Sequence, residues 1–188
     1  MNFEETRQHA FGWLRGAPRP ISEVTPKSTA FTECIEKHFE ELLTGGKCLV
    51  MCGGVGSGKT FAAYYAVAWC SAVGMRGLLK SSRELGQLAI QQKEYFDQLV
   101  KSKDLLVIDD VGAEHKSASG WAESVFEDLI NYRELHRLPT IITTNLNKED
   151  FGKAFGERVL SCLTGWGWYL QLTAETAPDL RAEQARSK

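Results

Sequence analysis

The stretch CGGVGSGKT, residues 52–60, constrains the fold of this 188-residue chain more than any other. Four of its positions match the pattern G-x-x-x-x-G-K-[ST], namely Gly53, Gly58, Lys59 and Thr60. The apolar run KCLVMC precedes it, and the apolar stretch FAAYYAVAWCSAV follows it at residues 61–73. Glycines in such a loop let backbone N–H groups turn inward around an anion, and the start of the following helix adds a partial positive charge. The pattern therefore predicts a buried strand, a phosphate-binding loop and a buried helix in succession.

Helical and strand patterns alternate along the rest of the chain. Apolar spacing predicts helices at the following residues: 28–43, 61–73, 84–100, 121–138, and one or two over 148–164. The expected strands are KCLVMC, MRGLLK, DLLVIDD, TIITTN and WYLQLT. Strands that alternate with helices indicate parallel β–α units and a covered sheet. The predicted fold class is therefore α/β, a three-layer domain around a five-stranded parallel sheet.

Two of these helices carry more detailed expectations. Ser81 and Glu84 have the S-x-x-E spacing of a capping box, so a helix should begin there and run to about residue 100. Its inner side is expected to carry Leu85, Leu88, Ala89, Tyr95, Phe96 and Leu99. The helix at 121–138 is expected to present one apolar stripe, namely Trp121, Val125, Leu129 and Tyr132.

The composition is that of one globular domain, with 43% hydrophobic residues, 24% charged residues and a net charge of −2. That charge argues against a purely basic nucleic-acid clamp. The five cysteines form no C-x-x-C pair and are interpreted as structural. The N-terminal MNFEETRQHAF lacks the basic start and apolar stretch of a signal peptide, and no run approaches 18 apolar residues. We therefore expect no membrane span and a cytoplasmic location.

Breaker residues separate the ends of the chain from its middle. Residues 1–27 contain three prolines and are predicted to form an irregular arm. The apolar side chains of this arm favour packing along its own domain, and docking to a partner is the alternative. Residues 28–175 form the predicted core, and residues 176–188 form a loose tail.

Lys59 and Thr60 have separate tasks if the bound phosphate belongs to ATP. Lys59 would reach the β- and γ-phosphates, and the Thr60 hydroxyl would be a magnesium ligand. The residues expected to bind the nucleotide are Gly53, Gly54, Val55, Gly56, Ser57, Gly58, Lys59, Thr60 and Phe61. The sequence therefore predicts ATP and Mg²⁺ as the ligands of this loop.

Acidic and polar residues end two of the later predicted strands. Ligands of an open parallel sheet collect at the carboxyl ends of its strands. Asp109 and Asp110 end LLVIDD, where Asp109 would bind magnesium and Asp110 would be the base that orients the attacking water. Thr144 and Asn145 end TIITTN and are expected to face the γ-phosphate side, with Asn145 holding the lytic water. The sequence thus predicts ATP hydrolysis at this edge of the sheet.

Four segments together resemble one family. GGVGSGKT, LLVIDDVG, PTIITTNL and GERVLSCL, within residues 30–181, resemble the DnaC/DnaI and IstB-like branch of the AAA+ ATPases. These are bacterial and phage replicative-helicase loaders and transposition helper ATPases. The resemblance implies a P-loop NTPase core without a full helical lid. It also implies Asp110 as the Walker B catalytic acid, Asn145 as sensor 1, and Arg181 as a near-terminal arginine that contacts nucleotide.

One position departs from the family pattern. The family places an arginine finger in a motif like G-E-R-V-x-x-R-L, and Cys162 stands here where that arginine is expected. Three alternatives follow. Arg158 or Arg133 takes over the role, the chain hydrolyses ATP slowly, or another protein supplies the arginine.

The resemblance implies self-association through the ATP site and work on a replicative helicase at single-stranded DNA. Candidate DNA contacts are residues 80–83 and the helix over 84–100, whereas Lys101 and Lys103 are interpreted as a solvated face. One alternative is an IstB-like transposition helper. Another is an interaction protein that binds nucleotide with little turnover. A small-molecule kinase is disfavoured, because no cluster of phosphate-binding arginines is visible.

Overall fold

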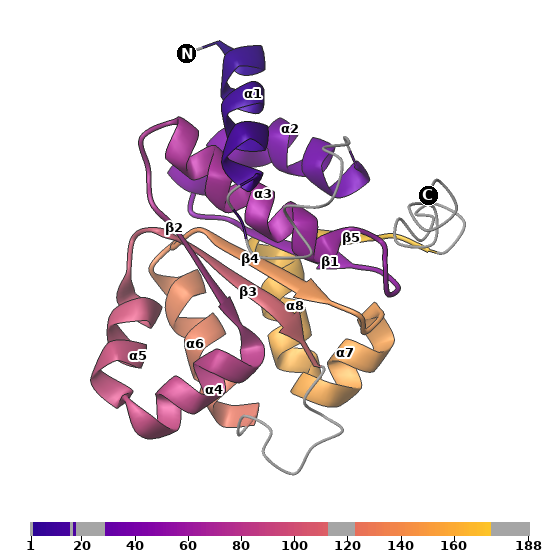
Figure 1. Ribbon diagram of the computed structural model, residues 1–188. Helices are drawn as coiled ribbons and strands as arrows, with labels where there is room; N and C mark the ends of the chain where they lie inside the picture. Colours follow the sequence, from indigo (N-terminus) through magenta and orange to yellow (C-terminus); the bar gives the residue numbers. More distant parts are fainter. Residues whose placement is uncertain (1, 16, 18–28, 113–122, 174–188) are drawn as a thin grey trace.

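The five expected strands form one sheet in the computed structural model, which describes residues 2–15, 17, 29–112 and 123–173. The strands are β1 (Cys48–Cys52), β2 (Gly77–Ser81), β3 (Leu105–Val111), β4 (Thr140–Thr144) and β5 (Trp168–Gln171). Every pair of neighbours is parallel, in the order β2-β3-β4-β1-β5. Figure 1 shows the sheet running through the middle of the molecule. The predicted α/β class and the five-stranded parallel sheet are confirmed.

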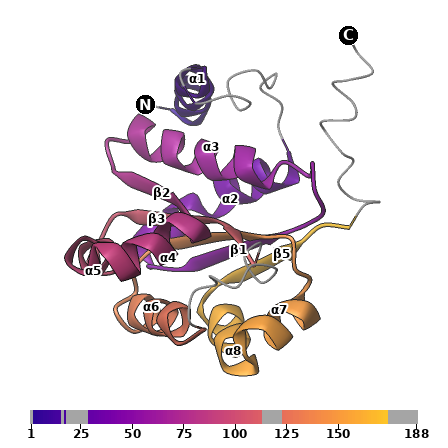
Figure 2. The same cartoon turned by 60° about the horizontal axis from the view of Figure 1, so that its bottom comes forward.

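Helices cover both faces of the sheet. In the described part of the chain they are α1 (Phe3–Leu14), α2 (Ala30–Thr44), α3 (Lys59–Ala72), α4 (Ser82–Gln91), α5 (Lys93–Lys101), α6 (Glu123–Leu135), α7 (Lys148–Phe155) and α8 (Glu157–Trp166). Figure 2 shows α1, α2 and α3 on one face and α6, α7 and α8 on the other. The buried residues of α4 and α5 join the core on the α6–α8 side. None of the helices in these ranges is long and apolar enough to cross a membrane.

Alternate strand residues supply two separate apolar cores. Met51 and Ile141 pack with α1, α2 and α3, whereas Val50, Ile108 and Ile142 pack with the helices of the opposite face. Successive side chains of a strand point to opposite faces, so a strand covered on both sides must be apolar throughout. This explains why the central strands carry no polar alternation.

The chain leaves the carboxyl ends of β1 and β4 toward opposite faces of the sheet. After β1 the chain runs into α3 on one face, and after β4 it runs into α7 on the other. Adjacent parallel strands whose connections leave in opposite directions form a crevice at their carboxyl ends, where open α/β sheets bind ligands. The predicted phosphate-binding loop begins at this point, directly after Cys52.

The N-terminal segment is helical where we expected an irregular arm. Asn2 caps α1 by accepting the Glu5 N–H at 2.9 Å, and the Glu5 carboxylate accepts the Asn2 N–H at 2.8 Å. This reciprocal cap satisfies N–H groups that the first turn leaves unpaired, so the helix begins there despite Gly12 near its end. The expectation of an irregular segment is wrong over Phe3–Leu14, whereas the prolines that suggested it lie outside the described residues.

Helix α1 packs along its own domain, as the apolar side chains of the segment indicated. Ala10 and Leu14 are buried, and the Phe11 ring lies 5.1 Å from the Tyr65 ring on α3. An ionic contact adds to this packing: Arg7 Nε lies 3.2 Å from Glu36 Oε1, which also accepts the Tyr65 hydroxyl at 2.5 Å. These contacts hold α1 against α2 and α3.

The helix predicted from Ser81 to residue 100 is two helices. The capping box is confirmed, because Ser81 Oγ accepts the Glu84 N–H at 3.1 Å. The helix ends at Gln91, and Gln92 has a non-helical backbone with φ −141° and ψ 59°. The break turns Phe96 into the core and leaves Tyr95 42% exposed, so the expected inward position of Tyr95 is wrong.

The buried face of α6 differs from the predicted stripe. Leu129 is buried as expected, but Val125 and Tyr132 are only partly buried, and Trp121 lies outside the described residues. The fully buried positions are instead Phe126, Leu129, Ile130 and Arg133. An arginine inside this face is the feature that apolar spacing could not reveal.

Candidate functional site

The phosphate-binding loop is a glycine-dependent turn between β1 and α3. Gly56 and Gly58 have φ values of 81° and 90°, a left-handed backbone that residues with a Cβ rarely adopt. At Gly53 an added Cβ would lie 2.8 Å from Ser57 Oγ, so a larger residue there would require the Ser57 side chain to shift. No side-chain hydrogen bond caps α3 at Gly58. The loop therefore presents the backbone amides of a helix N-terminus, an arrangement suited to an anion.

Lys59 folds back over this loop. Its Nζ donates to the carbonyl oxygens of Gly53 and Gly54 at 2.8 Å each, and lies 3.3 Å from Ser57 Oγ. The side chain is buried although it carries a charge, so these contacts offset part of its desolvation. Around it, Val55 is 70% exposed at the loop, whereas the Phe61 side chain is buried in the core. Any contact of Phe61 with a nucleotide would therefore come from its backbone.

Asp109 lies beside the first turn of α3. Thr60 Oγ1 donates to its Oδ1 at 3.4 Å, and Thr143 Oγ1 donates to the same oxygen at 2.5 Å. Burial raises the pKa of the Asp109 carboxyl, and the hydrogen bonds from Thr143 and Thr60 act in the opposite direction. A hydroxyl and a carboxylate are oxygen ligands of the kind that Mg²⁺ prefers. Thr60 and Asp109 thus fit the magnesium ligands expected from the sequence.

Asp110 has an unusual backbone. Its φ is 62°, and the pairing of β3 with β4 shifts register between Ile108 and Val111. A left-handed conformation costs a residue other than glycine about 1–3 kcal/mol and persists only where its surroundings hold it. In a regular strand the side chains of Asp109 and Asp110 would point to opposite faces. The bulge instead brings Asp110 Oδ1 within 3.3 Å of Asn145 Nδ2, which donates to it.

Sequence reasoning chose the wrong threonine of β4. Thr144 Oγ1 donates to Val111 O at 2.8 Å and accepts the Leu146 N–H at 3.0 Å, so its side chain is occupied in the backbone of the site. Thr143 is the one that contacts Asp109 and Asp110. The alternation of side chains along β4 could have identified Thr143, because Thr143 shares its face of the sheet with Ile141, which packs on the α3 side.

Arg133 is a structural residue and does not reach a neighbouring molecule. Its side chain is fully buried, with Nε donating to Thr140 Oγ1 at 2.9 Å. Its terminal nitrogens donate to the backbone carbonyls of Leu99, Val100, Ser102, Asp104 and Pro139. Burial lowers its pKa to about 10, which leaves it cationic at neutral pH. The alternative in which Arg133 replaces the finger arginine is therefore wrong.

Arg158 and Cys162 lie on α8 in different surroundings. The Arg158 side chain is 81% exposed and lies 3.4 Å from Glu127 Oε1. Cys162 is half-buried and its Sγ donates to Glu134 Oε2 at 3.0 Å. Burial and the Glu134 carboxylate raise the pKa of the Cys162 thiol to about 12, so it is neutral at physiological pH. Arg181 lies outside the described residues.

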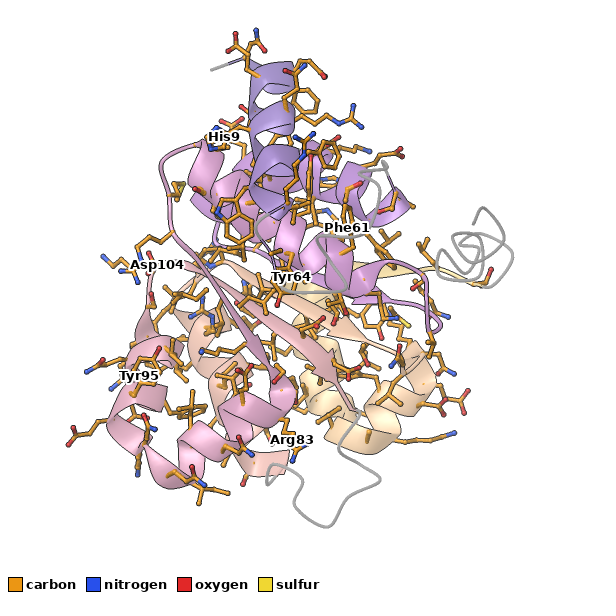
Figure 3. The ribbon with its side chains drawn as sticks, in the orientation of Figure 1. His9, Phe61, Tyr64, Arg83, Tyr95 and Asp104 are labelled. Atoms are coloured by element: carbon orange, nitrogen blue, oxygen red, sulfur yellow. The ribbon has the colours of Figure 1, made fainter. Side chains whose placement is uncertain are left out.

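The segment proposed to contact DNA is polar on its outer side, where Gln87, Gln91 and Lys93 are exposed. Ser81 serves as a helix cap and Ser82 is buried, whereas Arg83 is exposed. Figure 3 shows Arg83 on α4 well separated from Tyr95 on the outer side of α5. Lys101 and Lys103 are exposed, in agreement with the solvated face expected for them.

Comparison with known proteins gives a match in structure alone. No family model and no curated protein sequence matches the chain. Among solved structures, a DnaC helicase loader superposes with a TM-score of 0.65 at 23% identity, over 79% of this chain and 93% of that one. DnaI superposes with a TM-score of 0.66 at 20% identity, over 96% and 94%.

A replication initiator, DnaA bound to AMPPCP and single-stranded DNA, superposes with a TM-score of 0.64 at 18% identity. The superposition covers 87% of this chain but only 53% of the DnaA chain. The chain therefore has a fold of the DnaC/DnaI AAA+ type, as the sequence motifs indicated.

Proposed function

We propose that this chain is an ATPase that binds MgATP at the loop between β1 and α3. The observation that carries the proposal is the convergence of three sets of side chains at the carboxyl ends of neighbouring strands. Lys59 and Thr60 follow β1, Asp109 and Asp110 end β3, and Asn145 follows β4, which lies between the other two. Cation, hydroxyl, carboxylates and amide are the groups that phosphoryl transfer to water requires.

Each residue has a role that follows from its surroundings. The amides of the loop and the Lys59 ammonium bind phosphate oxygens, and Thr60 and Asp109 hold Mg²⁺, which neutralises charge on the phosphates when bound. Asp110 is exposed beside the crevice and accepts a proton from the attacking water. Asn145 donates to Asp110, which fixes the orientation of that carboxylate, and orients the water.

Slow or partner-stimulated ATP turnover follows from the absence of an arginine at position 162, where the family resemblance places the arginine finger. An arginine finger contributes about 10³–10⁵-fold to the rate, and Cys162 is a neutral thiol bonded to Glu134. Arg158 is held by a largely exposed ion pair with Glu127, a kind of contact worth about 0–1 kcal/mol. Arg158 can therefore leave Glu127 and contact the nucleotide phosphates bound to a second copy of the chain. The two copies would associate at the ATP site.

The process we propose is the loading of a replicative helicase onto single-stranded DNA. Support comes from the likeness to DnaC and DnaI, which extends over nearly the full length of both structures. The exposed Arg83 offers a phosphate contact for the strand. A second candidate is an interaction protein that binds nucleotide with little turnover. The Cys162–Glu134 bond favours it, because it places no cation at the finger position.

Turnover of ATP per chain, measured at rising protein concentration with and without single-stranded DNA, tests the proposal. Self-assembled sites predict turnover per chain that rises with concentration. Asp110→Asn should lower the rate at least about 10²-fold and leave nucleotide binding intact. Asp128→Asn is the matched control, because Asp128 is an exposed carboxylate on α6.

The outcomes separate the two candidates. Negligible turnover at every concentration, together with tight MgATP binding, would favour the interaction protein. Absence of MgATP binding would overturn both candidates. Nucleotide-dependent capture of a purified replicative helicase would support the loading role, and capture of a transposase instead would support the IstB-like alternative.

A further inference from the structure

The roles given above leave out Thr143, one of the most buried polar side chains near the crevice. It is 1% exposed and occupies the next-to-last position of β4. Its Oγ1 donates to Asp109 Oδ1 at 2.5 Å and accepts the Asp110 N–H at 2.8 Å. One hydroxyl therefore contacts both acidic residues, through the side chain of one and the backbone of the other.

These two hydrogen bonds involve the two unusual features at the end of β3, a buried carboxylate and a left-handed backbone. The Asp109 carboxylate is buried, and the bond from Thr143 is the shorter of its two hydroxyl contacts. The Asp110 backbone is left-handed, and its N–H belongs to the part of β3 where pairing with β4 shifts register. Thr143 supplies to that N–H the acceptor that a regular β3–β4 ladder would have supplied.

We propose that Thr143 is a positioning residue that aims both acids at the nucleotide site. Its O–H sets the direction of the Asp109 carboxylate toward Thr60, and its lone pair holds the bulge that directs Asp110 toward Asn145. The inference rests on the proposed function only in naming the nucleotide site. The positioning itself is a property of the protein without ligand.

Three variants separate positioning from general stability. Thr143→Val removes the hydroxyl at nearly constant shape, and Thr143→Ser keeps it. Thr144→Val is the matched control, because it removes a buried hydroxyl one residue further along that bonds Val111 and Leu146 and touches neither acid.

The first measurement is hydrogen exchange of the Asp110 amide in the ligand-free protein. Thr143→Val should speed exchange at least about tenfold, because the amide loses its acceptor, whereas Thr143→Ser and Thr144→Val should retain protection. The second measurement is the affinity for a fluorescent ADP with Mg²⁺ and with EDTA. In Thr143→Val, the increase in ADP affinity that Mg²⁺ confers should fall at least about tenfold, the effect expected when a hydrogen-bond partner of a metal ligand is removed. The affinity measured with EDTA should stay unchanged.

The inference would be overturned if the Asp110 amide of Thr143→Val exchanged at the wild-type rate. It would also be overturned if Thr144→Val changed Asp110 exchange and the Mg²⁺ effect as much as Thr143→Val does. If the wild-type protein binds ADP no better with Mg²⁺, the ATPase proposal fails, and Asp110 exchange alone then decides the role of Thr143. Wild-type exchange at Asp110 in Thr143→Ser, combined with loss of protection in Thr143→Val, supports it.

Discussion

At the scale of single residues, two arginines of this protein show how burial determines the role of a charged side chain. Arg158 is exposed and pairs with the Glu127 carboxylate, so it can exchange that partner for another. Arg133 is enclosed, and its contacts reach the end of α5, the segment before β3 and the segment before β4. Because five carbonyl oxygens accept its N–H groups, Arg133 works as a bridge between separate backbone segments.

Arg133→Met should lower the free energy of unfolding by about 3–5 kcal/mol. The substitution leaves buried carbonyl groups without a donor, and breaking a buried charged network costs that much. Urea unfolding followed by circular dichroism gives the value. Arg83→Met serves as the control, because an exposed arginine should change stability by less than about 0.5 kcal/mol. Equal stabilities of the two variants would contradict the structural role of Arg133.

At the scale of elements, α1 is the least expected helix and packs directly on the helix that carries Lys59 and Thr60. Its buried apolar residues Ala10 and Leu14 belong to the same core as Ala62 and Ala66 of α3. Aromatic rings also join the two helices, with Phe3 against Trp69 and Phe11 against Tyr65. The first helix of the chain therefore covers an apolar surface of α3 that would otherwise face solvent.

Leu14→Ala should destabilise the protein by about 2–5 kcal/mol, because Leu14 is 2% exposed in this core. The neighbouring Trp13→Ala removes a larger side chain that is 40% exposed. Trp13→Ala should therefore cost less than Leu14→Ala, despite its greater loss of volume. Thermal and urea unfolding of both variants measure the difference. A reversed order would show that α1 packs in another register.

At the scale of the whole molecule, a ligand that binds only the folded chain must stabilise all of it. At a free concentration of about 100 times Kd, MgADP should add about 2.7 kcal/mol to the free energy of unfolding. Lys59→Ala should abolish most of this gain, because it removes the cation held over the loop. Differential scanning calorimetry with and without MgADP measures the effect. A gain that survives Lys59→Ala would place the nucleotide elsewhere.

The overall architecture could be predicted because its determinants are local or periodic. The loop at residues 52–60 dictates its flanking strand and helix, and continuous apolar runs mark the covered strands. The remaining features depend on contacts between distant segments. The bulge at Asp110 needs β4 beside it, and Arg133 finds its acceptors on α5 and before two strands. Asp110 lies 33 residues from Thr143 in the sequence, and the acceptors of Arg133 on and after α5 lie 29 to 34 residues before it.

The burial of Arg133 has a consequence for how the protein would behave inside a cell. A change in stability of 1–2 kcal/mol can alter the abundance of a protein several-fold, because unfolded chains are degraded. Substitutions at this arginine should therefore reduce the amount of protein present before they alter what each molecule does. In a survey of tolerated substitutions, this cationic position will behave as a core position, because a side chain without its N–H groups leaves buried carbonyl oxygens without those donors.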